Sequence, residues 1–384
     1  MIPEATSLSA LATLIGSILA VAAGLVGGRL LAVSVGRLVE PRITAGSRAM
    51  LWAPVVAAAA TLTLWWWEVL CRGIVPEGAD ASFAMLAMRC GLHGILFLLL
   101  AAATWIDLRH RIIPDAITVP GVLAGLAALA AWPDGLLPVI REVPRSFAPP
   151  LREADVLGFF GPLRGPWPTW LEPAPMLAGL AIAAVAFTVW WLVGTEPGVS
   201  DTRMGAWWRR LVAPRPLVAI TGAAIVVTAW LVGGDHWRGL VSSLGGLAVS
   251  AGMVWLTRAG ASRALGREAM GLGDVTLMAM VGAWLGWQPC VLACFLAVFI
   301  GLAHGVAQLV LHSETELPFG PSLCLGAALV VVGWRPLWGR TEPFFERPLE
   351  MAAVVTAVIV LTAVTLWAWH RIRPISADLS LIHI

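Results

Sequence analysis

Two aspartates stand at the edges of long apolar stretches, in a chain with few other groups able to transfer a proton there. Asp107 ends one such stretch and Asp274 begins another. A carboxylate at membrane depth is costly, so it is a candidate functional residue. Two neighbouring carboxylates can share a proton, and one then activates water while the other protonates a carbonyl or leaving group. The sequence therefore predicts an acid–base pair, or alternatively two acids that each only cap a helix end.

Glycines and prolines accompany these acids. Gly271 and Gly273 precede Asp274, and because glycine lacks a Cβ they would let a substrate backbone approach closely. Farther on, residues 318–321 read Pro-Phe-Gly-Pro, so Pro318, Phe319, Gly320 and Pro321 should interrupt a helix near the site. Broken helices at membrane depth are tolerated where the backbone lines a cavity. We therefore expect these six residues to contact substrate.

The composition indicates a membrane protein. Of 384 residues, 59% are hydrophobic and 12% are charged, and the mean hydropathy is +0.84. A soluble domain carries about 25% charged residues, so this chain could not solvate its own surface. Disorder requires the opposite composition, and five cysteines in this length exclude a disulfide-rich fold. A net charge of +2 does not suggest a nucleic-acid partner.

We predict an all-α polytopic transmembrane helix bundle with about eleven spans, since each span needs about 20 mostly apolar residues. The predicted spans are Leu8–Val35, Met50–Leu70, Phe83–Ile106, Pro114–Trp132, Pro175–Gly194, Pro216–Gly233, Gly239–Thr257, Val275–Trp287, Cys290–Leu311, Phe319–Trp334 and Leu349–Trp369.

Arginine positions predict the orientation. Arginines follow the first, third, fifth, seventh and last spans, for example Arg109, Arg111, Arg209 and Arg258. Cytoplasmic loops carry an excess of basic residues. We therefore expect an N-out, C-in topology, which places both Asp107 and Asp274 at the cytoplasmic boundary.

Three regions are expected along the chain. Residues 1–132 form N-terminal membrane helices with the first aspartate motif, and 237–384 form C-terminal membrane helices with the second. Residues 133–236 form an insertion with two extra spans, beginning with an irregular, Pro-rich extracytoplasmic loop over 133–173. The cysteines form no C-x-x-C pair, so no metal site or cofactor is predicted.

Four patches of the chain resemble the prepilin peptidases, or type IV leader peptidases. Residues 107–121 read DLRHRIIPDAITVPG, and 268–287 read EAMGLGDVTLMAMVGAWLGW. Residues 317–327 read LPFGPSLCLGA, and the weaker fourth patch, 28–38, reads GRLLAVSVGRL. Their order along the chain agrees with that family, whose members are aspartic proteases of the G-x-G-D type in the bacterial cytoplasmic (inner) membrane.

The resemblance implies that Asp107 and Asp274 are the catalytic pair, with a water nucleophile and no metal. The implied substrates are type IV prepilins or type II secretion pseudopilins. These carry a short basic leader, a glycine and then an apolar helix, and the cut falls after the glycine on the cytoplasmic side. Glu314 and Glu316 could attract the basic leader, or they could form a solvated loop.

The chain also departs from the family. Many members carry two C-x-x-C pairs that hold zinc after the first span, and bifunctional members methylate the new N-terminus with S-adenosylmethionine. Here that connection has no cysteine, and Ala32 stands where asparagine is frequent. We therefore expect peptidase activity without methyltransferase activity. Thr276 stands where lysine is usual, which could alter activity or its pH optimum.

Three alternatives stay open at this stage. The pair could carry protons or cations in a secondary transporter, although transporter acids usually lie nearer the membrane midplane. The protein could be a catalytically altered homologue that acts in pilus or secretion assembly, given Thr276. It could instead cut within a substrate's membrane span, as presenilin-type proteases do. The sequence does not predict an oligomeric state, the particular prepilin or the role of 133–236.

Overall fold

The computed structural model describes most of the chain. The described residues are 3–39, 48–76, 81–145, 148–156, 167–173, 177–195, 214–266, 268, 270–312, 318–345, 347, 349–358, 360–361 and 364.

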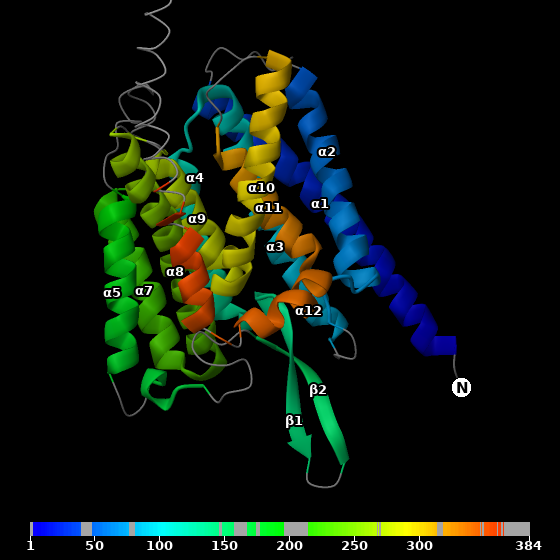
Figure 1. Cartoon of the computed structure of the whole chain (residues 1–384). Helices are drawn as coiled ribbons and strands as arrows, with labels where there is room; N and C mark the ends of the chain where they lie inside the picture. Colours follow the sequence, from blue (N-terminus) through cyan, green and yellow to red (C-terminus); the bar gives the residue numbers. More distant parts are fainter. Residues whose placement is uncertain are drawn as a thin grey trace, which may run out of the picture.

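The protein is a bundle of long helices with one β-hairpin at its end (Figure 1). α1 and α2 pair at one edge of the bundle, and α5 and α7 pair at the other. The helices are α1 (Pro3–Val39), α2 (Arg48–Trp65), α3 (Phe83–His110), α4 (Asp115–Ala131), α5 (Ala178–Gly194), α7 (Arg215–Val232), α8 (Gly234–Leu265), α9 (Leu272–Leu285), α10 (Trp287–His312), α11 (Gly320–Val332) and α12 (Trp334–Phe345), with a further apolar helix over Leu349–Val358.

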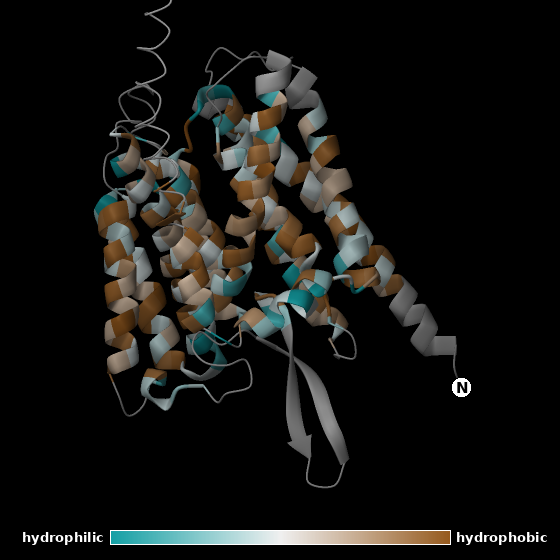
Figure 2. Cartoon of the chain, in the orientation of Figure 1, coloured by the Kyte–Doolittle hydropathy of each residue, from teal (hydrophilic) through white to brown (hydrophobic). Residues whose placement is uncertain are grey.

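The helices have the length and the surface of a membrane protein. Six are long and apolar enough to cross a bilayer, or seven if the bent pair of α11 and α12 counts as one span. Hydrophobic residues predominate along the helices (Figure 2). Many are exposed on the outside of the bundle, and Leu14, Ile18 and Leu19 of α1 are each more than half exposed. Patches of this extent indicate contact with lipid. The helical bundle and its multi-pass character are thus confirmed.

Each of the eleven predicted stretches overlaps a helix, but five of those helices have only 10–17 residues. The number of spans therefore stays a prediction. We did not predict α12. It follows α11 after a bend of 95° at Gly333, and its two arginines, one glutamate and two prolines do not indicate a membrane span.

Residues 138–156 correct the expectation of an irregular loop. Here β1 (Pro138–Arg145) and β2 (Ala148–Val156) pair as an antiparallel hairpin, the only sheet within the described ranges. The register places Arg141 opposite Glu153 and Glu142 opposite Arg152. Residues 138–145 and 148–156 therefore form two regular strands in place of an irregular loop.

The described parts of the insertion are joined to the bundle. α5 and α7 pack together, where the ring of Phe187 fills the space that a side chain at Gly222 would take. α7 in turn contacts α4 and α8. Trp237 at the start of α8 donates its indole N–H to the Leu171 carbonyl oxygen at 2.6 Å. The insertion thus widens the bundle next to α4 and α8.

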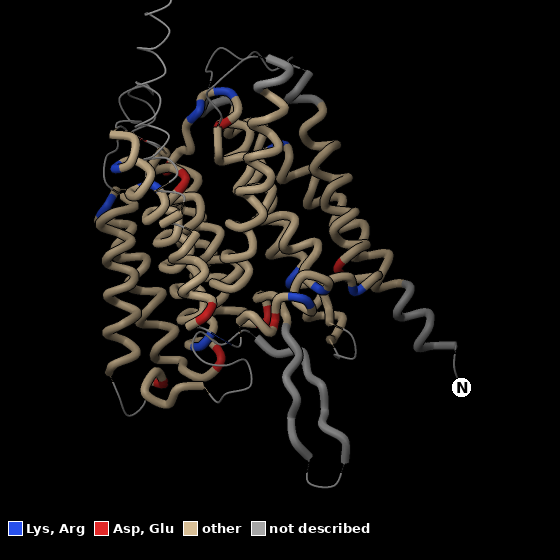
Figure 3. The backbone as a smooth tube through the Cα atoms, viewed as in Figure 1, with Lys and Arg blue, Asp and Glu red and all other residues tan. Residues whose placement is uncertain are grey.

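The predicted orientation stays a prediction. Charged residues lie toward the two ends of the bundle, and the backbone between them is largely free of such residues in the coloured part (Figure 3). Both ends carry arginines among the described residues. Arg109 lies in the last turn of α3 and Arg111 directly follows this helix, whereas Arg335 and Arg340 belong to α12 near the hairpin. Several arginines on which the prediction relied, such as Arg209, lie outside the described residues.

A charged cluster is buried between α2 and α3, toward the hairpin end. The segment Trp66–Leu70 forms a π-helical turn that carries Glu68. Glu68, Arg89 and His93 are almost completely buried. His93 Nδ1 lies 2.7 Å from Glu68 Oε1, and Arg89 Nε donates to the Asp134 carbonyl oxygen at 2.8 Å. The cluster therefore ties α2, α3 and the start of the insertion together, as buried charges require partners.

Breaking this cluster should destabilise the protein in a defined order. Glu68→Leu removes the only carboxylate hydrogen-bonded to His93 in the described part and leaves the Arg89 charge less compensated. We expect a loss of about 3 kcal/mol, in the range for breaking a buried pair. His93→Leu should cost less, because Glu68 still faces Arg89. The measurement is thermal unfolding in detergent followed by tryptophan fluorescence, and equal effects of the two variants would contradict this account.

Candidate active site

Asp107 lies at the end of α3 and is 5% exposed. α3 stops one turn later, where Arg111 adopts a left-handed conformation with φ 55° and its N–H bonds the Asp107 carbonyl oxygen at 2.8 Å. Such a conformation in a residue other than glycine marks a constrained turn. The turn sends residues 112–114 back across the bundle toward α4.

The Asp107 carboxylate accepts a hydrogen bond from the backbone N–H of Gly320. Gly320 is the first residue of α11, and the first N–H groups of a helix have no partner within their own helix. Asp107 therefore caps α11 from another helix, at the helix end that favours negative charge. A Cβ on Gly320 would overlap the carboxylate oxygen Oδ2, so only glycine fits here.

Asp274 lies in the first turn of α9 and is 8% exposed. Its carboxylate accepts a hydrogen bond from the N–H of Gly271, the residue that precedes α9. An acid at the third helical position that bonds back to the residue before the helix is the acidic half of a capping box. Asp274 thus caps the helix that carries it. This is the role that the alternative to an acid–base pair assigned to each acid.

The two carboxylates lie within electrostatic range of each other. Both carboxylates also interact electrostatically with the Cys324 thiol of α11. That thiol is hydrogen-bonded to Thr104, which lies one turn before Asp107. Capping and pairing are therefore compatible, because the two helix starts bring both acids into one buried site. Sequence reasoning missed Thr104 and Cys324, although their helical spacing from Asp107 and Gly320 was a usable signal.

The two glycines before Asp274 have different surroundings. A Cβ on Gly273 would lie 3.0 Å from the Cβ of Ile113 and 3.2 Å from its carbonyl oxygen. The close approach at Gly273 is thus to the connection that follows Asp107, and its role toward substrate stays a prediction. A Cβ added to Gly271 would lie 3.8 Å from the Gly273 nitrogen and 3.9 Å from Asp274 Oδ2, which are ordinary contact distances. The described residues therefore do not crowd Gly271, and its role toward substrate stays a prediction as well.

α9 is held on two sides. On the α4 side, Trp284 donates its indole N–H to the Gly121 carbonyl oxygen at 2.9 Å. On the α8 side, the Ser250 hydroxyl donates to the Met278 carbonyl oxygen at 2.6 Å, and Gly282 packs directly on the backbone of Gly246. Small residues let membrane helices approach this closely. The packing positions Asp274 relative to α3 and α4.

The structure describes some of the other predicted residues but not all of them. Pro318, Phe319 and Pro321 surround Gly320 and are partly exposed, so they lie beside the aspartate pair. Glu314 and Glu316 lie outside the described residues. Thr276 is buried and donates its hydroxyl to the Gly273 carbonyl oxygen at 3.0 Å, which stabilises the turn before Asp274.

The expectation that no metal or cofactor takes part stays a prediction. No group of three or more His, Cys, Asp or Glu side chains there could hold a metal ion. All five cysteines are free. Cys90, Cys290 and Cys324 are buried, Cys294 is partly buried and Cys71 is exposed. The groups described at the site are two carboxylates, two helix N-termini, the Thr104 hydroxyl and the Cys324 thiol.

The fold and the site together define a polytopic helical membrane protein with a buried aspartate pair. Residues 207–306 match the type IV leader peptidase family. This stretch includes Asp274, whereas Asp107 and the 317–327 patch lie beyond it. No solved structure matches the chain.

Several proteins named prepilin leader peptidase/N-methyltransferase are similar to this chain. One from Pseudomonas aeruginosa is 44% identical over 78 residues, which are 19% of this chain and 25% of that protein. One from Aeromonas salmonicida is 38% identical over 78 residues, with the same coverage. One from Aeromonas hydrophila is 33% identical over 118 residues, 27% of this chain and 39% of that protein. The matches thus span a quarter to two fifths of these relatives, and they confirm the resemblance to the prepilin peptidase family.

Gly320 offers a direct test of the site's geometry. Gly320→Ala should displace the Asp107 carboxylate, because the new Cβ would occupy its place. We expect the activity proposed in the next subsection to fall at least tenfold while the protein still folds. Gly339→Ala in α12 is the matched control, since no heavy atom lies within 4 Å of its added Cβ. Equal activity of the two variants would show that Asp107 does not need this position.

Proposed function

We propose that the protein is an aspartic endopeptidase that removes the leader of type IV prepilins or type II secretion pseudopilins at the cytoplasmic face of the bacterial inner membrane. The observation that carries this proposal is the meeting of three motif patches around two carboxylates. Gly320 bonds Asp107, Ile113 packs on Gly273, and Gly121 accepts from Trp284. The matches to proteins named prepilin leader peptidase support the substrate class.

The reaction needs one proton shared between the two acids. Buried carboxylates in electrostatic range cannot both ionise cheaply, so one retains a proton. The ionised member takes a proton from water, and the resulting hydroxide attacks the carbonyl carbon of the peptide bond. The protonated member gives its proton to the carbonyl oxygen. Return of a proton to the amide nitrogen then breaks the C–N bond and leaves an acid and a new amine.

The site has features suited to a glycine-containing cut site. Gly271 leaves space beside the Asp274 carboxylate, so a substrate backbone could lie there. Glu314 and Glu316 precede Pro318, and their charge is complementary to the basic leader of a prepilin. The predicted cytoplasmic position of both acids agrees with a leader that remains in the cytoplasm.

Removal of either titratable group should abolish cleavage. Asp107→Asn and Asp274→Asn keep the size of each side chain and remove its acid–base function. In co-expression with a prepilin from the same genome, we expect processing by the wild type and a loss of at least a thousandfold in each variant. The measurement is the gel mobility of the prepilin, with sequencing of the product's N-terminus. Asp235→Asn is the matched control, because Asp235 is 80% exposed at the opposite end of the bundle.

The results separate the alternatives. Cleavage that survives either Asn variant would refute the proposed catalytic pair. A wild type that processes no prepilin offered would favour a catalytically altered homologue or a transporter. A new N-terminus within the apolar helix would indicate cleavage of the presenilin type.

We expect this chain to leave the new N-terminus unmethylated. The chain has no C-x-x-C pair, and Ala32 stands where the family frequently has asparagine. The product of a cleavage reaction with S-adenosylmethionine should therefore have the mass of the unmodified peptide in mass spectrometry. The Pseudomonas aeruginosa protein, named as an N-methyltransferase as well, serves as the positive control. A methylated product from this chain alone would show that the cysteine module is dispensable.

A further inference from the structure

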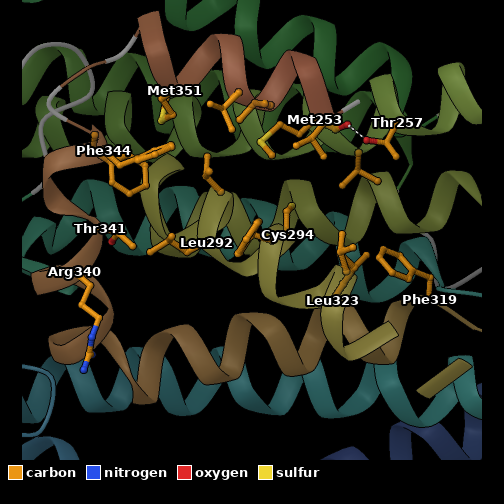
Figure 4. A pocket seen from close by; sticks show the side chains of 18 of the residues that line it. Met253, Thr257, Leu292, Cys294, Phe319, Leu323, Arg340, Thr341, Phe344 and Met351 are labelled. Atoms are coloured by element: carbon orange, nitrogen blue, oxygen red, sulfur yellow. Dashed lines mark hydrogen bonds between the residues drawn. The ribbon is translucent and has the colours of Figure 1, made fainter. Parts of the chain in front are cut away.

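An apolar groove opens between α8, α10, α11, α12 and the helix Leu349–Val358. Its volume is about 380 Å³. Figure 4 shows Phe319 and Leu323 at one end, and Phe344 and Met351 toward the other. Among the lining residues, only Thr257, Arg340 and Thr341 carry polar side-chain groups other than sulfur. The Thr257 hydroxyl donates to the Met253 carbonyl oxygen of its own helix, so that polar group is satisfied.

One end of the groove lies beside the aspartate pair. Met270 lines the groove and directly precedes Gly271, whose N–H bonds Asp274. Phe319 lines it too and directly precedes Gly320, whose N–H bonds Asp107. Each carboxylate therefore accepts a hydrogen bond from a residue that directly follows a groove residue. A bound peptide that extends beyond this end of the groove would therefore reach the aspartate pair.

The other side of the groove faces the surrounding lipid. Phe295 and Val298 of α10 line it and are 57% and 55% exposed, and Phe344 of α12 is 53% exposed. A ligand could thus enter sideways from the bilayer. The lining includes methionines and phenylalanines, and methionine is flexible enough to adapt to helix faces of different sequence.

We propose that this groove binds the apolar helix that follows the cleavage site of the substrate. This inference rests on the proposed function. A peptide in an apolar groove must hydrogen-bond its own backbone, which a helix does. An amphipathic or apolar helix in a groove is a frequent recognition mode. The helix would lie along α10, and the chain just before it would extend past Phe319 to the aspartates, where the bond is cut.

The test compares two substrates. One is a full-length prepilin, and the other is a soluble peptide with the leader and cut site but without the apolar helix. The Val298→Trp side chain should fill the groove. The measured quantity is kcat/KM for the prepilin divided by kcat/KM for the peptide, and this ratio should fall at least tenfold in the variant. Leu302→Trp is the matched control, because Leu302 lies one turn farther along α10, is 64% exposed and does not line the groove. Its ratio should equal that of the wild type.

A second measurement uses the wild-type chain. Cys294 lines the groove. In a series of prepilins that each carry one cysteine in the apolar helix, we expect a disulfide with Cys294 under mild oxidation. The cross-linking positions should be three or four residues apart, because they lie on one face of the helix. Cys294→Ala should abolish the cross-link. This result does not depend on the folding of the Val298 variant.

Each outcome decides the proposal. An unchanged substrate ratio in Val298→Trp, or no cross-link to Cys294 in a wild type that cleaves prepilin, overturns the groove assignment but leaves the peptidase intact. Labelling of the groove by a photoactivatable phospholipid in place of the prepilin shows that lipid is its occupant and also overturns it. If the wild type cleaves neither substrate, the proposed function itself fails.

Discussion

The site depends on unpaired backbone N–H groups at two helix starts. The first N–H groups of a helix need an acceptor other than a backbone carbonyl of their own helix. In α9 that acceptor is the Asp274 carboxylate, which bonds Gly271. In α11 it is Asp107 from α3, which bonds Gly320. Because two capped helix starts lie side by side, two buried carboxylates come within electrostatic range. The structural role of each acid thus creates the chemical pair.

This arrangement tolerates little movement. Gly320 has no room for a Cβ next to Asp107, and Gly273 has little next to Ile113. α9 is also held by α4 and α8 through Trp284, Ser250 and contacts between glycines. Glycine is costly in a helix because it is flexible when unfolded. In this site that cost is offset by an approach of backbones that no larger residue allows.

The hairpin end of the bundle has a different organisation. Glu68, Arg89 and His93 form a buried cluster there, and Trp334 donates to the Pro138 carbonyl oxygen at 2.7 Å. Arg238 bonds Glu172 with two guanidinium nitrogens, at 2.7 and 2.9 Å. These contacts join the insertion to the helices on which the site is built. The site end and the insertion end are thus stabilised separately, by glycine packing at one and by polar contacts at the other.

The sequence by itself determined the membrane class, the approximate position of each predicted helix and the identity of the two acids. Apolar stretches of this length have no other solvent, and an acid at their edge is conspicuous for that reason. The sequence did not predict the β-hairpin, α12 or the contacts of Thr104 and Cys324. Only the tertiary structure decided that Asp107 caps α11, since that bond joins residues far apart in the chain. The apolar groove was hidden for the same reason, because its lining comes from five helices that are separated along the chain.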